Sequence, residues 1–479
     1  MAPAAVTYAA NNSWIYAAVA GFNRHAESAL LHRNIKKAPL RAIRVEGNCI
    51  ILEDGRRILD AAGGAAVACL GYQSIERINA AITQQQGLMS YVPSHIFTTE
   101  VAEDFGRFLI DSTKGKMAKF CMYHDGSVSM DAAVKLAIQY HQEKPNPELG
   151  RINLISREGS YHGNTGFALS LSGHRARRRR YEAFLQKDTR FHRIPAVYPY
   201  RDRLTGESDE AYIERKAKEL DQKIEDVGPK TVAAFAIEPV GGATQGSTVP
   251  PKGYLRAIEK VCRKHGVLII FDEIMCGMGR MGTTLHAWQR EGVVPDIQAV
   301  GKSLAGGYQA AAGILVGHRI VDALWQGTGA FMHGHTYQNH SMPIVAAFEV
   351  QKYIKEKGLL ENVRQMGELL QGTLKQRLRN EIHVGDVRGD GLLITIEFVQ
   401  DKATKECFPR HMKVVERFFE MALNEPYNLH VYSGCGEAVP DKGEGKGDHI
   451  MLCPPFNITR TEILNIVDKV CQLIHDFEF

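Results

Sequence analysis

The chain has 479 residues, of which 44% are hydrophobic and 23% are charged, and its net charge at pH 7 is +4. This is the composition of an ordinary globular protein, with enough material for one large core or two domains. The small net charge does not favour a nucleic-acid or membrane partner. No stretch approaches the roughly 20 apolar residues that cross a membrane, so we expect neither partner.

The cysteines and the N-terminus both favour a cytoplasmic protein. The nine cysteines are dispersed and form no C-x-x-C pair, which is typical of reduced thiols in a reducing compartment. The N-terminal stretch is apolar in places, but its first basic residue is Arg24. A signal peptide needs earlier positive charge and a longer apolar run.

Short apolar runs alternate with helical patterns along most of the chain. Residues 42–60 are expected to form two strands around a turn at Asp54–Gly55. Further strands are predicted at 119–123, 151–156, 231–240, 267–274, 296–302 and 311–317, with helices opening after 124 and at 254–266. The alternation predicts an α/β fold with a mainly parallel sheet covered on both faces. After about residue 345, helices and the segment 383–399 predict a smaller α+β unit that packs with the N-terminal segment.

Two glycine-rich segments resemble nucleotide-binding motifs, and neither meets the spacing. In "AVGKSLAGG" (299–307), Lys302 follows a glycine as in a phosphate-binding loop, but Asp296 stands where that motif needs its first glycine. "GMGRMG" (277–282) matches G-x-G-x-x-G, but five residues separate it from the preceding apolar run, and Asp296 precedes the next strand instead of ending it. We interpret these glycines as a tight loop that brings backbone close to a ligand.

One segment, "HRARRRRYEAF" (174–184), carries a run of positive charge. Nucleic-acid binding is the weaker interpretation, because nothing else in the sequence supports it. We expect a solvated loop or helix face.

Several polar residues lie where the predicted strands end, and in such sheets the binding and active sites form at the carboxyl ends of the strands. Asp272 follows five apolar residues, and a buried carboxylate needs a partner such as a protonated ring nitrogen. Lys302, at the next strand end, can attack a carbonyl if desolvation and a neighbouring cation lower its pKa. Gly126–Ser127 open a helix whose free N–H groups favour a phosphate, and Tyr161 and His162 suit a flat ring. Each residue alone has an ordinary structural explanation, but together they fit pyridoxal 5′-phosphate.

The run at 236–316 strongly resembles the class-III, or omega, aminotransferases, which are fold-type-I pyridoxal-phosphate enzymes. The resemblance extends over nearly the whole chain, from 45–72 through 447–459. It implies a large domain at 76–340 with a mainly parallel seven-stranded sheet. It also implies a small α+β domain formed by the N-terminal segment 1–75 and the C-terminal part 341–479.

The resemblance assigns roles around the cofactor ring. Lys302 is implied as the lysine that forms the Schiff base, and Asp272 as the partner of the pyridinium nitrogen. Ile274 packs on one face of the ring and Tyr161, followed by His162, stacks on the other. Glu238 matches a family glutamate near the phenolic side of the cofactor.

The resemblance also assigns the phosphate end of the site. Gly126 and Ser127 are implied to hold the phosphate. Thr336, in "HGHTYQNH" (333–340), looks like the threonine that reaches the phosphate of the neighbouring subunit's cofactor. This implies a homodimer with two shared active sites. We assign no metal ligands.

Three positions depart from patterns common in the family. Ala243 and Met451 stand where some members have a glutamate and an arginine that gate and hold an α-carboxylate. Without them we expect an apolar pocket that accepts an amine or a long-chain amino substrate. Val128 replaces a common glutamate of the "GSEA" turn, and we expect this change to affect only the packing of the turn.

The sequence therefore predicts an aminotransferase that moves an amino group between an amine or amino-acid donor and a keto or aldehyde acceptor. Lys302 would act as nucleophile and base, and Asp272 would keep the ring nitrogen protonated. The same constellation also allows decarboxylation, racemisation or an amino shift within one molecule. A catalytically silent protein that binds the cofactor is a weaker alternative, because Lys302 and Asp272 are both present.

Overall fold

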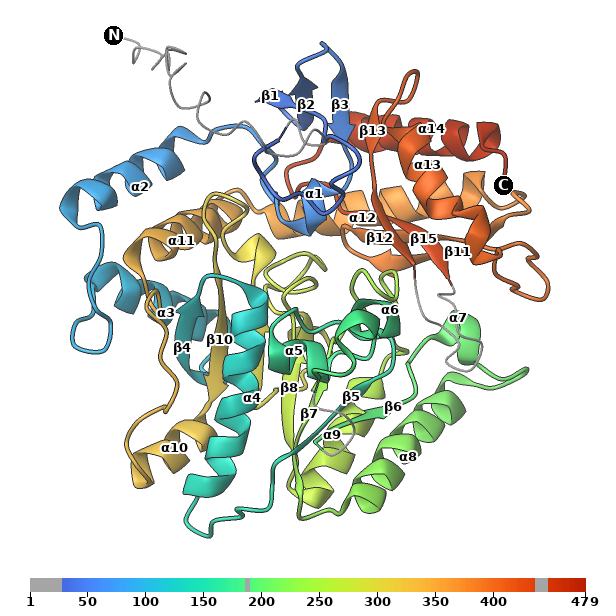
Figure 1. Cartoon of the computed structure of the whole chain (residues 1–479). Coiled ribbons are helices and arrows are strands. Elements are labelled where there is room, and N and C mark those ends of the chain that lie inside the picture. The colour runs from blue at the N-terminus through green and yellow to red at the C-terminus, as the bar shows by residue number, and fades with distance from the viewer. Residues whose placement is uncertain (1–27, 186–189, 436–446) are drawn as a thin grey trace, which may run out of the picture.

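A computed structural model describes residues 28–185, 190–435 and 447–479 of the chain. The N-terminal stretch considered above as a signal peptide lies outside the described residues. Figure 1 shows the large sheet with its helices in one half of the molecule, and the smaller sheets with helices from the C-terminal part of the chain in the other.

The seven-stranded sheet has the order β4-β10-β9-β8-β7-β5-β6. Strands β9, β8, β7, β5 and β6 run parallel to one another, while β10 is antiparallel to both β9 and β4. The prediction of a mainly parallel seven-stranded sheet is therefore confirmed. Strand β6, in which two half-buried residues lie between two buried ones, was not predicted. The strands are β4 (Met117–Tyr123), β5 (Asn153–Arg157), β6 (Phe191–Ile194), β7 (Val232–Ile237), β8 (Leu268–Asp272), β9 (Ile297–Val300) and β10 (Ala312–Gly317).

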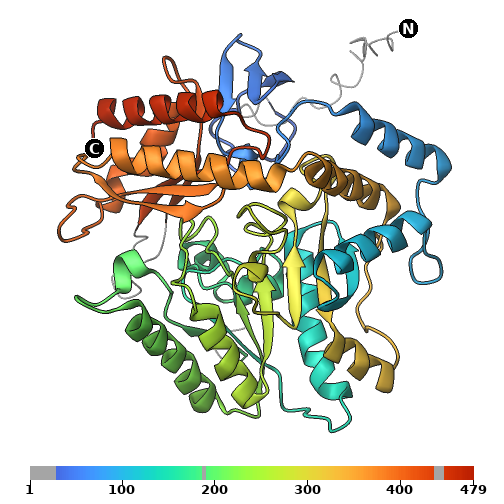
Figure 2. The same ribbon diagram turned by 180° about the vertical axis from the view of Figure 1, so that it is seen from behind.

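Helices cover both faces of this sheet because its central strands are apolar on both sides. In β8, Leu268 and Ile270 pack in the cluster under α4 (Gly126–Glu143), which crosses the sheet in Figure 1. The alternate residues Ile269 and Phe271 pack under α8 (Asp209–Val227) and α9 (Tyr254–His265), seen in Figure 2. The other helices of this half are α2 (Glu76–Leu88), α3 (Glu100–Ser112), α5 (Gly166–Leu171), α6 (Arg175–Arg178), α7 (Pro199–Asp202), α10 (His318–Gln326) and α11 (Ser341–Glu356), with 3-10 turns η1 (Arg179–Tyr181), η2 (Ala287–Arg290) and η3 (Lys302–Leu304).

The other half contains two four-stranded sheets, β1-β2-β3-β13 and β11-β12-β15-β14. Residues 42–60 form three strands instead of the predicted two, because the chain turns at Gly47–Asn48 as well as at Asp54–Gly55. One core cluster joins Leu59 and Cys69 from the N-terminal segment to residues from the last third of the chain. The elements are β1 (Ala42–Glu46), β2 (Cys49–Leu52), β3 (Arg57–Asp60), α1 (Gly63–Ala66), α12 (Leu359–Arg377), β11 (Val384–Asp390), β12 (Leu393–Phe398), η4 (Arg410–Met412), α13 (Val414–Ala422), β13 (Leu429–His430), β14 (Tyr432–Cys435), β15 (Asp448–Leu452) and α14 (Arg460–Asp476).

Candidate active site

The predicted site residues lie at one edge of the seven-stranded sheet. Asp272 is the last residue of β8, and Glu238 follows β7 directly. Lys302 comes two residues after β9, and Gly126 opens α4 after β4. Because β7, β8 and β9 are parallel neighbours, their carboxyl ends bring these side chains to the same place.

Asp272 is buried, with 5% of its surface exposed. Its Oδ2 accepts a hydrogen bond from Nδ1 of His162 at 2.8 Å, and its Oδ1 accepts one from the backbone N–H of Ile274 at 3.1 Å. The backbone N–H of His162 is in turn bonded to Oγ of Ser172 at 2.8 Å. His162 therefore orients the carboxylate, which differs from the ring-stacking role expected for it.

Glu238 links the loop after β5 to the loop after β7. Its Oε2 accepts from the backbone N–H of Tyr161 at 3.3 Å and its Oε1 from that of Gly242 at 3.0 Å. Burial raises the pKa of Glu238, while His162 lowers it and nearby Asp272 raises it again. The site thus holds two buried carboxyl groups that influence one another.

Lys302 sits in a left-handed backbone conformation, with φ of 45°, at the start of η3. A non-glycine residue rarely adopts this conformation without a compensating role, and such strain is common at functional sites. Burial lowers the pKa of Lys302, and the charges of Asp272 and Glu238 oppose that change. The prediction that a neighbouring cation lowers the pKa of Lys302 is therefore wrong, because desolvation is the cause. Throughout the described residues, no group hydrogen-bonds to Lys302 Nζ.

Ile274 fills the space between Gly126 and Gly301. A Cβ on Gly126 would lie 2.6 Å from Cδ1 of Ile274, and one on Gly301 would lie 3.3 Å from its Cγ2. Both glycines therefore let the backbone approach this side chain closely. The arrangement leaves Ile274 beside the residue that precedes Lys302.

The first turn of α4 is capped by Asp125, which is not among the predicted site residues. Its Oδ1 accepts from the backbone N–H of Ser127 at 2.8 Å and from that of Val128 at 3.0 Å. Asp125 also pairs with Nε2 of His124 at 3.0 Å. An aspartate before Gly-Ser is a recognisable N-cap in the sequence. The amide of Ser127 expected to hold a phosphate is thus occupied by a carboxylate of the chain itself.

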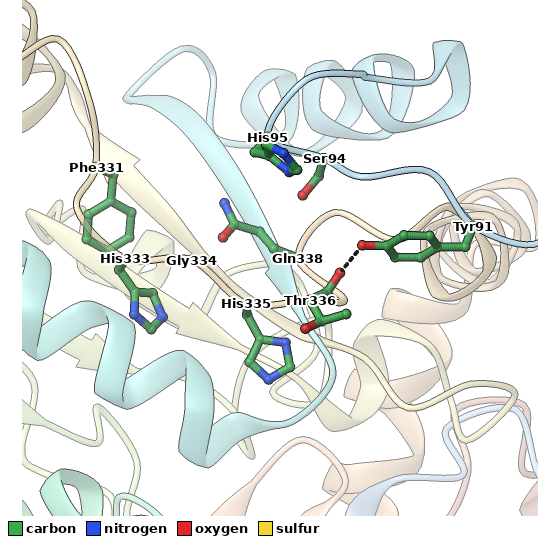
Figure 3. Close-up of a pocket in the computed structure, with 9 residues that line it drawn as sticks. All are labelled: Tyr91, Ser94, His95, Phe331, His333, Gly334, His335, Thr336 and Gln338. Carbon is green, nitrogen blue, oxygen red and sulfur yellow. Dashed lines mark hydrogen bonds between the residues drawn. The ribbon is translucent and has the colours of Figure 1, made fainter.

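Thr336 lies in a loop beside an open cavity of about 550 Å³. Figure 3 shows the Tyr91 hydroxyl bonded to the backbone carbonyl of Thr336, at 3.0 Å. In the same chain His335, not Thr336, approaches the start of α4, since its ring centroid lies 4.5 Å from that of His124. The lining residues are Tyr91, Ser94, His95, Phe331, His333, Gly334, His335, Thr336 and Gln338.

The loop 277–282 has a structural role and forms no dinucleotide site. It consists of turns and opens no helix. The buried Arg280 side chain donates to the backbone carbonyls of Leu392, Cys453 and Pro454, so it fastens the loop to the smaller sheets. Asp296 is paired with Arg263 at 2.8 Å and Arg319 at 2.6 Å.

The basic run is predicted to be a solvated loop or helix face, but the structure buries part of it. Arg178 on α6 is only 5% exposed and pairs with Glu182 at 3.3 Å. The guanidinium carbon of Arg177 lies 4.5 Å from the centre of the Tyr161 ring. The run therefore reaches the candidate site through Tyr161.

These residues suit a pyridoxal-phosphate cofactor. Within the described part of the chain, two buried ring nitrogens near the site, His162 Nε2 and His124 Nδ1, have no hydrogen-bond partner. The unbonded Lys302 amine and the buried Asp272 carboxylate complete a set that matches an aldehyde and a ring N–H. The fit lies in this donor set.

Comparison with known proteins decides the family. The family model "Aminotransferase class-III" matches residues 31–474. The chain belongs to the class-III aminotransferases. Their cofactor is pyridoxal 5′-phosphate, so the predictions of family, fold type, enzyme class and cofactor are confirmed.

Relatives of this aminotransferase agree over nearly their full lengths. An aminotransferase of Gibberella zeae is 42% identical, with 94% of this chain and 87% of the relative covered. Vanillin aminotransferase of Capsicum frutescens is 31% identical, with 92% of each covered. The omega transaminase of Pseudomonas jessenii in complex with PMP superposes with a TM-score of 0.83 at 31% identity, covering 91% of this chain and 92% of that one. Among the described residues, no helix of this aminotransferase is long and apolar enough to cross a membrane.

Proposed function

We propose that this aminotransferase transfers an amino group from a small amine or amino-acid donor to a keto or aldehyde acceptor, with Lys302 and Asp272 as its catalytic residues. The observation that supports these roles is the unbonded, buried Lys302 amine one strand away from the buried Asp272 carboxylate. When bound, pyridoxal phosphate supplies a ring that withdraws electrons from the substrate carbon.

Lys302 would hold the cofactor through its aldehyde, and the lysine amine, once the donor amine has taken its place, would move a proton at the substrate carbon. A lysine can remove a proton only when its amine is uncharged, and burial lowers the pKa of Lys302 in that direction. Asp272 would accept a hydrogen bond from the protonated ring nitrogen of the bound cofactor. His162 keeps the Asp272 carboxylate in place. Glu238, which accepts from the backbone N–H of Tyr161, would face the phenolic side of the cofactor.

Tyr161 and Ile274 enclose the two faces of the ring, and Gly126 and Ser127 hold the phosphate. Asp125 must release the Ser127 and Val128 amides before a phosphate can take them, because two anions do not share these donors. Ala243 and Met451 provide no charge for a substrate carboxylate, and Met451 is buried in an apolar cluster.

The second subunit contributes Thr336 to the phosphate of its neighbour. Large apolar side chains around the Thr336 loop are exposed: 67% for Ile96, 56% for Phe97 and 53% for Tyr337. A patch of this kind needs a partner, and a second copy of the chain is the occupant that we propose. If so, cofactor stabilises the dimer by mass action, and sedimentation at several protein concentrations should show tighter dimers with cofactor than without it.

We also propose the division into a large domain at 76–340 and a small domain formed by 1–75 and 341–479, and a cytoplasmic location.

The reaction is tested by following nitrogen between two different molecules. An amine donor labelled with ¹⁵N should bleach the yellow absorbance of the holoenzyme, and an unlabelled keto acceptor should restore it and carry the label away. Labelled product found only as a rearranged or decarboxylated donor would instead indicate another pyridoxal-phosphate reaction.

A further inference from the structure

A buried glutamine, Gln351, lies against the turn that carries Lys302. Gln351 is on α11, and only 1% of its surface is exposed. Its side-chain Nε2 donates one hydrogen bond to the backbone carbonyl of Ser303 and one to that of Leu304, at 2.8 Å each. Ser303 and Leu304 directly follow Lys302 and form η3 with it. The side-chain amide of Gln351 therefore binds the chain immediately after the lysine assigned to the cofactor.

The surroundings of Gln351 on its own helix are apolar. Val350 and Ile354, its neighbours on α11, are buried in the core cluster that joins the two ends of the chain. Burying an amide among apolar side chains is unfavourable unless its polar atoms are hydrogen-bonded. Both N–H donors of the amide are used on the turn, while its Oε1 has no partner among the residues that the structure describes. The bonds to the turn are thus what a glutamine adds at this position.

The turn needs such bonds because the backbone of Lys302 is strained. Its φ of 45° is left-handed, and a residue other than glycine keeps this conformation where the surrounding structure holds it. Ser303 and Leu304 are buried, so their carbonyls are shielded from bulk water. The Ser303 carbonyl also accepts a longer bond, of 3.5 Å, from Sγ of Cys69. Without the Gln351 amide, the Leu304 carbonyl would lose the partner that fixes its direction.

The orientation of this turn decides where the Lys302 amine lies. In the proposed reaction the amine must reach first the cofactor aldehyde and then the substrate carbon. A misplacement of about 1 Å can lower such a rate about a hundredfold. Gln351 bonds to the backbone beside Lys302, so it would affect the reaction by placing the lysine.

We propose that Gln351 is a positioning residue for Lys302, whose side-chain amide holds the turn so that the lysine amine reaches both reacting atoms. This proposal rests on the aminotransferase function above and adds a residue to its machinery. Loss of the amide should therefore slow the proton transfer at the substrate carbon and leave the binding of the donor unchanged.

The test compares Gln351→Met with Gln371→Met, because methionine keeps the length of glutamine but has no N–H donor. Gln371, on α12, is the matched control, since its Nε2 also donates to a backbone carbonyl, that of Gly389 at 3.0 Å. Pentylamine, 5-aminopentanoate and alanine are screened with the wild-type holoenzyme, and bleaching by the fastest donor is followed over a range of concentrations. Gln351→Met should lower the limiting rate about ten- to a hundredfold and leave the half-saturating donor concentration unchanged. Gln371→Met should keep both wild-type values.

Hydrogen exchange in the cofactor-free enzyme provides a readout independent of turnover. Backbone N–H groups of the turn bond to its own carbonyls, as that of Gly306 does to Lys302 at 3.1 Å. A peptide covering residues 301–306 should exchange faster in Gln351→Met than in wild type, and at the wild-type rate in Gln371→Met. Faster exchange with an unchanged limiting rate, or an equal loss of rate in both variants, would overturn the proposal.

Gln351→Glu separates loss of the donor from a change of packing. Its acid has the shape of the glutamine amide and offers an O–H donor only while it is protonated, a state that burial favours. Its limiting rate divided by that of Gln351→Met should exceed one at about pH 6 and fall toward one at about pH 9. A ratio of one at both pH values would overturn the proposal.

Failure of the reaction itself is distinguishable from failure of this proposal. If no donor bleached the wild-type holoenzyme, the aminotransferase function would fail. Hydrogen exchange would still decide whether Gln351 holds the turn at Lys302, and unchanged exchange in Gln351→Met would overturn that role.

Discussion

The two ends of the proposed cofactor site are built differently. At the ring end, Asp272 and Glu238 are buried and bonded to neighbouring groups, and Lys302 is held in a strained conformation beside them. At the phosphate end, Asp125 occupies the helix amides and Thr336 lies exposed on a loop. The first end is complete within one chain before any ligand binds. The second needs a rearranged carboxylate and, in our proposal, a second chain.

This difference follows from where the polar groups lie. Carboxylates at the carboxyl ends of parallel strands are enclosed by the sheet and by helices on both faces, so they must be bonded internally. The free backbone N–H groups of a helix N-terminus and the polar groups of a surface loop can form hydrogen bonds with water, with a side chain or with a ligand. We therefore expect changes at the ring end to affect chemistry, and changes at the phosphate end to affect binding.

The largest effect is expected for Lys302→Ala. Among the described residues we place no other lysine at this strand end, so none can replace Lys302. General acid–base catalysis alone typically raises a reaction rate by about 10²- to 10⁴-fold, and turnover should therefore become undetectable. Borohydride treatment of the wild-type holoenzyme, followed by peptide mass mapping, should label Lys302. The exposed Lys260→Ala on α9 is the control and should retain full activity. A label on a different lysine would show the assignment to be wrong.

Asp272→Asn should slow the half-reaction roughly ten- to a hundredfold, because the shape is kept while a charge-assisted interaction worth about 1.5–3 kcal/mol is lost. Stopped-flow bleaching with an amine donor measures the rate, and thermal melting checks that the variant folds. Rates close to wild type would mean that the ring nitrogen has another partner.

The lowered pKa of Lys302 predicts that the buried lysine destabilises the cofactor-free enzyme to an extent that depends on pH. The unfolded chain binds the lysine proton more tightly than the folded one, so burial of Lys302 destabilises the fold most at pH values below its folded pKa. This destabilisation disappears as the pH rises toward the ordinary pKa of a lysine side chain, about 10.4. Lys302→Met should therefore raise the denaturation midpoint at pH 7 and raise it less at pH 10. An advantage that grows with pH would contradict the sign.

The smallest effect is expected at Asp125. Asp125→Asn keeps the helix cap, since the two residues cap about equally well, but removes the charge that competes with phosphate. Pyridoxal phosphate should bind about two- to fivefold more tightly, corresponding to the roughly 0.3–1 kcal/mol of one charge at a helix end. Absorbance titration measures this, and pyridoxal without phosphate should show no change. Weaker binding of the phosphate form would indicate that Asp125 supports the cofactor.

The ring end could be predicted from sequence because its signals are local. Asp272 directly follows five apolar residues and Lys302 ends the next such run, so strand position alone places them together. The hydrogen bond from His162 could not be predicted, because it joins residues 110 positions apart. The contact of Arg177 with Tyr161 depends in the same way on how α6 packs. Asp125 is an exception, because an aspartate directly before Gly-Ser is itself a capping signal in the sequence.

The contrast between the two ends is tested most directly by mixing two inactive proteins, Lys302→Ala and Thr336→Trp. If each site takes Lys302 from one chain and Thr336 from the other, every mixed dimer contains one site with both lesions and one site with neither. Random mixing should then restore about a quarter of the wild-type activity. No recovery in mixed dimers verified by mass spectrometry would show that Thr336 serves the cofactor of its own chain or none.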